Sequence, residues 1–258
     1  MPEYCKVEKD GRILTVTLNR PARLNALHPL ANSELGEVFD DFADDPELWV
    51  AIITGEGRGF CAGNDLKFQA EGKMKGIEVP TRGFGGLTAR YDCDKPVIAA
   101  VNGVAMGGGF EIALACDLII ASAEAKFALP EPRVGLAALA GGVHRLPRQI
   151  GLKHAMGMML TGRRVSAKEG LELGFVNEVV PAAELMATAR RWAEEICECA
   201  PLSVRASKQA AMQGMAYGTI EAAMEAKYDG IRDMVKSDDF IEGPRAFAEK
   251  RKPAWKGR

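Results

Sequence analysis

The stretch KPVIAAVNGVAMGGGFEIALACDLIIAS, residues 95–122, decides the fold of this chain. Its apolar run at 97–101 predicts a strand, the residues after the three glycines predict a helix, and DLIIAS at 117–122 predicts a second strand. Strands that are apolar at every position are typical of a parallel sheet with both faces covered. The stretch therefore predicts a strand, helix, strand unit of an α/β fold.

The same alternation continues on both sides of this stretch. Residues 5–18 predict a hairpin around an Asp-Gly turn, residues 28–45 predict a helix, and residues 50–57 predict another buried strand. From about residue 182 the spacing is almost entirely helical, with one helix expected over 219–237. We therefore expect a core α/β domain and a helical C-terminal region. The boundaries of these two parts are 1–195 and 196–258.

Composition and charge exclude several classes of protein. The chain has 258 residues, a formal net charge of -2 and 47% hydrophobic residues, which is typical of a globular protein and lacks the basic excess of a nucleic-acid binder. Six scattered cysteines indicate reduced thiols, and three histidines have no metal-ligand spacing. The N-terminus lacks the apolar core of a signal peptide. We expect a cytoplasmic protein that binds neither membrane nor nucleic acid.

Three glycines stand at 107–109, where the predicted strand gives way to the predicted helix. The first turn of a helix has unpaired backbone N–H groups, and glycine lets another group approach them closely. A tight turn with Glu111 as a helix-capping acid is one interpretation. A dinucleotide fingerprint does not fit, because Ile112 occupies the position of its third glycine, and neither does a phosphate loop. An oxyanion site is the remaining alternative.

A second turn of small residues, GFCAGNDL at 59–66, follows the predicted strand at 50–57. Turns at the carboxyl ends of parallel strands meet at one edge of the sheet, so this turn can supply a second N–H donor. A further carboxylate, Glu131, stands between two prolines in FALPEPRVGL. Two glutamates that converge beside two N–H donors would form an acid/base pair at an oxyanion hole.

The chain resembles the enoyl-CoA hydratase, or crotonase, superfamily over nearly its whole length. The resemblance is carried by residues 95–122 and by RPARLNAL (20–27), AIITGEGRGFCAGNDLK (51–67), FALPEPRVGL (127–136), GGVHRLPRQIG (141–151) and LTGRRVSAKEGLELGFVNEVV (160–180). It implies an α/β fold, a crotonase-like spiral of ββα units with a helical C-terminal portion that assembles a homotrimer or a dimer of trimers. It also implies an acyl-CoA thioester as the small-molecule partner, with no metal and no cofactor, since CoA is part of the substrate.

The resemblance also assigns site residues. The backbone N–H groups of Asn64 and Gly108 match the two oxyanion-hole donors, and Glu111 and Glu131 match the two catalytic glutamates. The residues implied in substrate binding are Arg23, Leu24, Ala62, Asn64, Asp65, Leu66, Lys67, Gly107 and Gly108.

The two N–H donors and the two glutamates suit the reversible syn addition of water to a 2-enoyl-CoA, which is the reaction of a hydro-lyase. Negative charge moves onto the thioester oxygen in the transition state, where two N–H donors stabilise it. We expect Glu111 to orient and deprotonate the water and Glu131 to protonate the alpha carbon, although a coupled pair leaves the opposite division open. A double-bond isomerase, a thioester hydrolase and a non-catalytic binding protein of this fold are the alternatives.

Within the superfamily, the sequence is most similar to carnitinyl-CoA dehydratases and short-chain enoyl-CoA hydratases. A trimethylammonium head would need an aromatic or acidic cage, to which Tyr91, Phe84, Phe68 or Glu71 could contribute. The segment VGLAALAGG at 134–142 departs from the family pattern and leaves the acyl preference open.

Other residues have structural interpretations. Asp65 is expected to cap a helix at LKFQA, and His144 to be a packed or capping histidine. Arg90 and Lys95 are expected to be surface charges, and the basic C-terminal tail a solvated end. Residues 68–83, with mixed charge and no steady period, are expected to form a mobile loop that acts as a lid or substrate wall.

Overall fold

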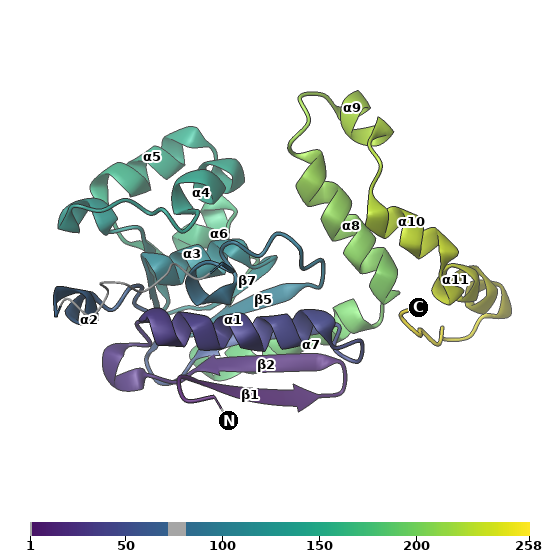
Figure 1. Cartoon of the computed structure of the whole chain (residues 1–258), viewed down its shortest axis with the longest axis horizontal. Helices are drawn as coiled ribbons and strands as arrows, with labels where there is room; N and C mark the ends of the chain where they lie inside the picture. The colour runs from purple at the N-terminus through teal and green to yellow at the C-terminus, as the bar shows by residue number, and fades with distance from the viewer. Residues whose placement is uncertain (1, 72–80) are drawn as a thin grey trace.

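A six-stranded sheet lies at the base of the computed structural model, which describes residues 2–71 and 81–258 (Figure 1). Its strands, in spatial order, are β1 (Cys5–Asp10), β2 (Ile13–Leu18), β3 (Val50–Gly55), β5 (Val97–Val101), β7 (Leu118–Ser122) and β10 (Glu178–Val180). The pair β1 and β2 is antiparallel and forms the predicted hairpin, whereas all other neighbours run parallel. The predicted parallel sheet is thereby confirmed.

A second, smaller sheet is built from strands of two or three residues. In spatial order these are β4 (Gly59–Cys61), β6 (Val104–Met106), β8 (Lys126–Ala128) and β9 (Val165–Ser166). The strands β4, β6 and β8 run parallel, and β9 is antiparallel to β8. The sequence does not predict this sheet, because a three-residue strand is too short to show a period of two.

The chain passes repeatedly from a strand of the large sheet to a strand of the small sheet and then to a helix. The strands β3 and β4 lead to α2 (Leu66–Ala70), β5 and β6 lead to α3 (Gly108–Ala115), and β7 and β8 lead through a 3-10 turn (Glu131–Val134) to α4 (Gly142–Ile150). This order confirms the predicted spiral of ββα units.

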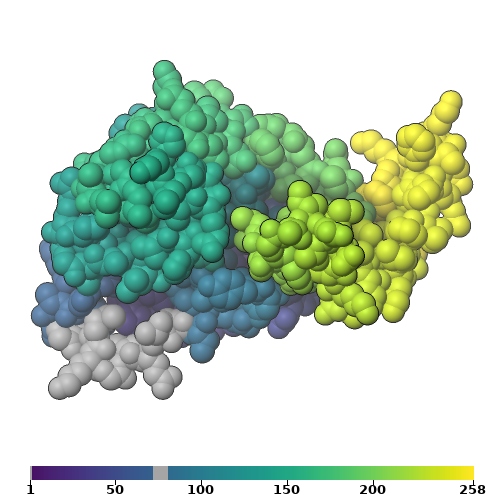
Figure 2. Space-filling view, turned by 90° about the horizontal axis from the view of Figure 1, so that it is seen from above, coloured from purple at the N-terminus to yellow at the C-terminus, as the bar shows by residue number. Residues whose placement is uncertain are grey.

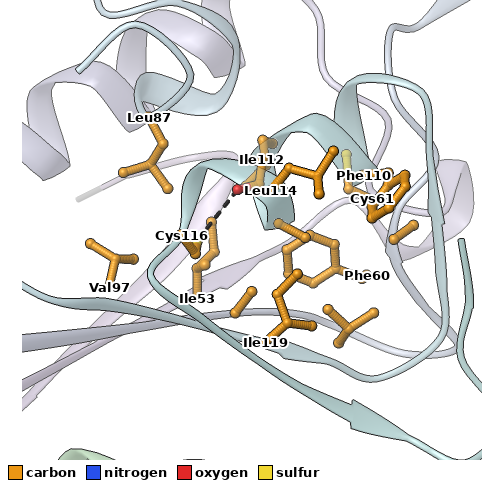
Figure 3. Packing of buried hydrophobic residues seen from close by; sticks show 14 of the residues in the cluster. Ile53, Phe60, Cys61, Leu87, Val97, Phe110, Ile112, Leu114, Cys116 and Ile119 are labelled. Atoms are coloured by element: carbon orange, nitrogen blue, oxygen red, sulfur yellow. Dashed lines mark hydrogen bonds between the residues drawn. The ribbon is translucent and has the colours of Figure 1, made fainter. Parts of the chain in front are cut away.

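Both faces of the large sheet are buried, which explains its continuous apolar strands. Ile52 faces one side with α7 (Leu185–Cys197), whereas its neighbour Ile53 faces the other side with α3 and α1 (Pro29–Asp44). Figure 3 shows Phe110 and Ile112 of α3 packed in the hydrophobic cluster on the Ile53 side of the sheet. Almost no side of α3 faces solvent, so its residues can be apolar around nearly the whole helix.

The remaining helices lie in the second half of the chain. They are α5 (Leu152–Thr161), α6 (Ala167–Leu173), α8 (Pro201–Gly214), α9 (Ile220–Glu225), α10 (Asp229–Lys236) and α11 (Asp238–Glu249). The prediction of one helix over 219–237 is wrong, since α9 ends at Glu225 and α10 begins at Asp229. The helices after α8 lie to one side of the α/β body (Figures 1 and 2). The expected boundary at 195/196 falls inside α7.

The basic side chains of the C-terminal tail are exposed, as predicted for a solvated end, but the tail is also fastened to the rest of the chain by hydrogen bonds. The carboxylate of Asp239 accepts hydrogen bonds from the amides of Lys256 and Gly257, each at 2.8 Å. The indole N–H of Trp255 donates to the carbonyl of Glu198 at 2.7 Å. Acidic and carbonyl acceptors on two helices therefore hold a segment whose sequence is mostly basic.

Each helix in the described ranges is too short or too polar to cross a lipid bilayer.

Arg90 and Lys95 are buried, which contradicts their prediction as surface charges. The Arg90 guanidinium donates to the carbonyls of Gly86 and Gly36 at 2.8 and 2.9 Å and pairs with Asp40 at 2.8 Å. The Lys95 ammonium donates to two carbonyls at the C-terminal end of α1, each at 2.7 Å. Buried cations are tolerated when their N–H groups are satisfied in this way, and no local sequence pattern reveals such distant acceptors.

Replacement of Arg90 by Met should lower the free energy of unfolding by about 2 to 4 kcal/mol, because it removes the guanidinium donor from two buried carbonyls and the ion-pair partner of Asp40. Arg190→Met is the matched control, since Arg190 also pairs with two carboxylates but lies on the surface. The control should change stability by less than about 1 kcal/mol. Urea unfolding of both variants measures the difference, and equal losses would contradict this account of Arg90.

Candidate active site

Three turns meet at the carboxyl ends of the short parallel strands β4, β6 and β8. The first turn contains Asn64, the second contains Gly107 and Gly108, and the third contains Glu131. Because β6 pairs with both β4 and β8, the three turns are neighbours in space. The first two turns were predicted to meet at the edge of the large sheet, but it is the small sheet that brings them together.

The backbone around Asn64 and Gly108 is closely apposed. A Cβ atom at Gly63 would lie 3.1 Å from the amide nitrogen of Gly108 and 2.7 Å from the carbonyl oxygen of Met106. Pairing with Leu27 fixes the turn, since the Leu27 amide donates to Gly63 and the Asp65 amide donates to Leu27, each at 2.9 Å. The amides of Asn64 and Gly108 have no backbone acceptor in these regions of the described chain. Two N–H donors thus border one small space.

Glu111 lies in the first turn of α3 and is only 3% exposed. Its Oε1 atom accepts a hydrogen bond of 2.8 Å from the amide of Gly142 at the start of α4. The pKa of Glu111 is raised from 4.5 to about 7. Burial is the largest cause and the charge of Glu131 also raises it, while the backbone amides of Gly142 and Ala140 and the guanidinium of Arg145 lower it. This carboxyl group can therefore exchange a proton near neutral pH.

Glu131 faces the same space from the 3-10 turn after β8. Burial also raises the pKa of this carboxyl. A Cβ atom at Gly107 would lie 2.8 Å from its Oε1 atom, so only glycine leaves room for the carboxylate there, and Gly107 also has a positive φ of 54°. The Oε2 atom of Glu131 is buried and has no hydrogen-bond partner among the described residues. Such an atom is suited to bind a water molecule or a ligand.

The two glutamates line a cavity of about 790 Å³. Of the residues predicted for the site, Ala62, Asn64, Leu66, Gly107, Gly108, Glu111 and Glu131 line it. Apolar side chains dominate the rest of its wall, among them Phe84, Tyr91, Val134, Leu136 and Leu139. A cavity of this kind accepts an apolar group beside a few polar atoms.

The other predicted residues lie outside this lining. Asp65 caps α2 by accepting a hydrogen bond of 3.2 Å from the Phe68 amide, as predicted, and it also pairs with Arg20 at 3.0 Å. Arg23 and Lys67 are exposed, and the carbonyl of Leu24 accepts a hydrogen bond of 2.9 Å from the Ala62 amide. The predicted lid at 68–83 lies largely outside the described residues, because positions 72–80 are not described.

Three parts of the cavity wall were either not predicted from the sequence or predicted wrongly. Gly142 was not predicted to contact Glu111, although the glycine pair before α4 was a possible signal. Thr88 and Ala89 also line the cavity, and nothing in their local sequence indicates it. The prediction for His144 is wrong, since its side chain is exposed, lines the cavity and caps no helix. Cys61, beside the first turn, is buried, and burial raises the pKa of its thiol to about 12.

The described residues bring together no group of three or more histidine, cysteine, aspartate or glutamate side chains that could hold a metal ion.

The arrangement can hold an oxyanion against two amides and move protons between a bound ligand and two carboxyl groups. Buried carboxyl groups with raised pKa values at a cavity wall are typical of acid/base sites. The charge of Glu131 raises the pKa of Glu111, so the ionisation of one carboxyl group affects the proton affinity of the other.

Residues 8–258 match the enoyl-CoA hydratase/isomerase family. The carnitinyl-CoA dehydratase of Proteus mirabilis is 48% identical over 257 residues, covering 96% of each chain. The carnitinyl-CoA dehydratase of Escherichia coli O157:H7 is 46% identical over 267 residues and 100% of each chain. The solved structure of an enoyl-CoA hydratase from Mycobacterium tuberculosis H37Rv is similar with a TM-score of 0.92, 38% identity and 99% coverage of both chains.

The buried Glu111 should make stability depend on pH. The folded-state pKa is raised from 4.5 to about 7, so the folded chain binds this proton more tightly than the unfolded chain. The contribution of Glu111 to stability is therefore intact below pH 4.5 and is lost as pH rises through 7. Glu111→Gln should unfold with a free energy roughly 2 to 3 kcal/mol higher than the native chain at pH 8, and nearly equal at pH 4.

Urea unfolding at the two pH values measures this difference. Glu172→Gln on the exposed side of α6 is the control and should match the native chain at both. A Glu111→Gln variant no more stable than the native chain at pH 8 would contradict the raised pKa.

Proposed function

The chain belongs to the enoyl-CoA hydratase/isomerase family, and on this premise we propose that its cavity adds water reversibly across the double bond of a 2-enoyl-CoA to give a 3-hydroxyacyl-CoA. The chain is an enzyme of the hydro-lyase class that acts on CoA thioesters. The observation that carries the proposal is the pair of buried carboxyl groups, Glu111 and Glu131, beside the apposed amides of Asn64 and Gly108.

The amides of Asn64 and Gly108 stabilise the thioester oxygen. Addition of the oxygen of water to C3 pushes electrons toward that carbonyl, so its negative charge is larger in the transition state than in the substrate. Preorganised N–H donors therefore lower the barrier rather than only tightening binding. The absence of a backbone acceptor for either amide among the described residues supports this role.

Glu111 and Glu131 move the protons. Glu111, held by the Gly142 amide, orients and deprotonates the water, and Glu131 delivers a proton to C2. The Oε2 atom of Glu131, which has no hydrogen-bond partner among residues 2–71 and 81–258, supports its role, because a buried oxygen of this kind needs a partner that a ligand can supply. The roles are exchanged in dehydration.

The CoA part of the substrate lies along the strip from Ala62 to Lys67, with Arg23 and Leu24 near the nucleotide. The hydrogen bond from the Ala62 amide to the Leu24 carbonyl places these two segments side by side and supports the assignment. The reaction needs no further cofactor, because water is added and removed without a change in oxidation state.

Hydration should depend on both carboxylates. Glu111→Gln and Glu131→Gln should each lower kcat with crotonyl-CoA by about 100- to 10,000-fold, because an amide neither accepts nor delivers the proton. The loss of absorbance of the conjugated enoyl thioester measures turnover, and calorimetry with a saturated acyl-CoA should show binding within a few-fold of the native chain.

Glu172→Gln, on the exposed face of α6, should keep native activity. Full activity in either active-site variant would contradict the mechanism. Release of free CoA thiol, or migration of the double bond without hydration, would assign the chain instead to the thioester hydrolases or the isomerases.

The region 196–258 assembles the chain into a homotrimer or a dimer of trimers. Large apolar side chains on its helices are exposed in the single chain, including Met224 and Ile220 of α9 at 80% each and Phe247 of α11 at 88%. A groove of about 930 Å³ between α8, α9 and α10 adds apolar surface beside them. Surface of this extent is typical of a subunit interface.

Light scattering after size exclusion should give three or six times the chain mass of 27.8 kDa. The double change Ile220→Glu and Met224→Glu should reduce that mass, because it places charges in the proposed interface. A native chain that elutes as a monomer at micromolar concentration would contradict the proposal.

A further inference from the structure

We propose that Phe84 is a specificity-determining residue, whose ring keeps water away from the thioester carbon so that the cavity hydrates its substrate instead of hydrolysing it. The inference rests on the proposed function and concerns the same cavity, which Phe84 lines. The residue lies in GFGGLT, residues 83–88, a segment with no part in the oxyanion hole or the acid/base pair. The structure of this segment fixes where the ring lies.

The ring of Phe84 packs against the turn that carries the Gly108 amide. A Cβ atom at Gly108 would lie 2.5 Å from one ring carbon of Phe84 and 2.8 Å from two others, so the lack of a side chain at 108 leaves room for the ring. A Cβ atom at the preceding residue, Gly107, would instead lie 2.8 Å from the Oε1 atom of Glu131. The turn is thus bordered by a carboxylate at Gly107 and by an aromatic ring at Gly108.

The backbone that follows Phe84 is wedged between two helices. A Cβ atom at Gly85 would overlap the Cδ1 atom of Ile112 in α3, and one at Gly86 would lie 2.6 Å from the carbonyl oxygen of Leu35 in α1. Both glycines have positive φ angles, 62° and 69°, which other residues adopt at a cost. These contacts leave the segment little freedom to move away from α3.

Buried side chains also hold the backbone amides at the ring. Asn32 of α1 accepts a hydrogen bond of 2.7 Å from the amide of Gly85, and the hydroxyl of Thr88 accepts one of 2.7 Å from the amide of Phe84 itself. Asn32 is 6% exposed and Thr88 is 3% exposed. Hydrogen bonds among buried groups are costly to break, so the segment keeps the ring in one place.

The place of the ring matters because water can attack an enoyl thioester at two carbons. Attack at C3 gives the hydrated thioester. Attack at the carbonyl carbon, C1, forms a C–O bond, breaks the C1–S bond and transfers one proton of the water to the sulfur, which gives the free acid and the CoA thiol. The amides of Asn64 and Gly108 polarise the carbonyl for both reactions. Access of water to C1 therefore decides between them.

The ring covers the thioester on the Gly108 side and leaves the side of the carboxyl groups open. The thioester oxygen binds the Gly108 amide, so C1, which is bonded to that oxygen, lies within reach of a ring that already contacts Gly108. An apolar ring excludes water there and lowers the local dielectric around the N–H donor. Water is thus admitted at Glu111 and Glu131, where it adds to C3, and is kept from C1.

Butyryl-CoA separates the two reactions, because it has no double bond and can be hydrolysed but not hydrated. A thiol reagent measures the CoA released. Phe84→Ala should release CoA from butyryl-CoA at least about tenfold faster than the native chain, and should hydrate crotonyl-CoA with a kcat about tenfold lower and a KM within about threefold. A lower hydration rate without faster release of CoA would overturn the inference, since the ring would then only position the substrate.

Tyr91→Ala is the matched control, since it removes another aromatic ring from the wall of the same cavity, and Tyr91 is 80% exposed. It should release CoA from butyryl-CoA no faster than the native chain. An equal gain of hydrolysis in the two variants would overturn the assignment to Phe84.

Phe84→Leu covers the case in which Phe84→Ala does not fold, because leucine keeps much of the apolar volume. It should release CoA from butyryl-CoA at least about threefold faster than the native chain, since a smaller side chain covers less of the thioester. Release at the native rate by a folded Phe84→Leu variant, with Phe84→Ala unfolded, would overturn the inference.

The proposed function and the inference fail in different ways. A native chain that does not hydrate crotonyl-CoA contradicts the proposed function, while butyryl-CoA still reports on the ring. A native chain that hydrates crotonyl-CoA and also hydrolyses butyryl-CoA as fast as Phe84→Ala overturns the inference alone.

Discussion

The parallel pairing of β4, β6 and β8 is the constraint on which the rest of the site depends. Each strand is three residues long and contributes little stability by itself, yet each ends in a turn that carries one part of the site. Strand spacing in a parallel sheet is about 5 Å, so the three turns are held within reach of one small ligand. The close approach of Gly63 to the Gly108 amide, and of Gly107 to the Glu131 carboxylate, requires residues without a Cβ atom.

The burial of two carboxyl groups beside these turns is costly for folding and useful for chemistry. Glu111 is the one charged residue of an otherwise apolar helix, and its buried carboxylate accepts a hydrogen bond from the backbone amide of Gly142 at the start of α4. Desolvation therefore raises its pKa into the neutral range, where a carboxyl group can act as base or acid. The same apolar surroundings that lower stability at high pH thus produce a group suited to proton transfer.

Much of the fold and part of the site could be predicted from the sequence. The apolar strands at 50–55, 97–101 and 118–122 and the glycines before α3 have clear patterns, because each depends on neighbours close in the chain. The prediction failed where partners are distant. Arg90 and Lys95 find carbonyl acceptors 50 or so residues away, and His144 lines the cavity through the position of α4. The small sheet was not predicted because its strands are too short to show a period of two.

The sequence by itself determined the family, the apolar strands of the large sheet and the four residues proposed for chemistry, since periodicity, turn residues and motifs are local properties. The tertiary structure decided the burial, the hydrogen-bond partners and the neighbouring charges of those residues. It placed Gly142 on Glu111 and left the Oε2 atom of Glu131 without a partner in the described chain. Burial and distance between segments far apart in the chain control desolvation and charge, and these quantities exist only after the chain has folded.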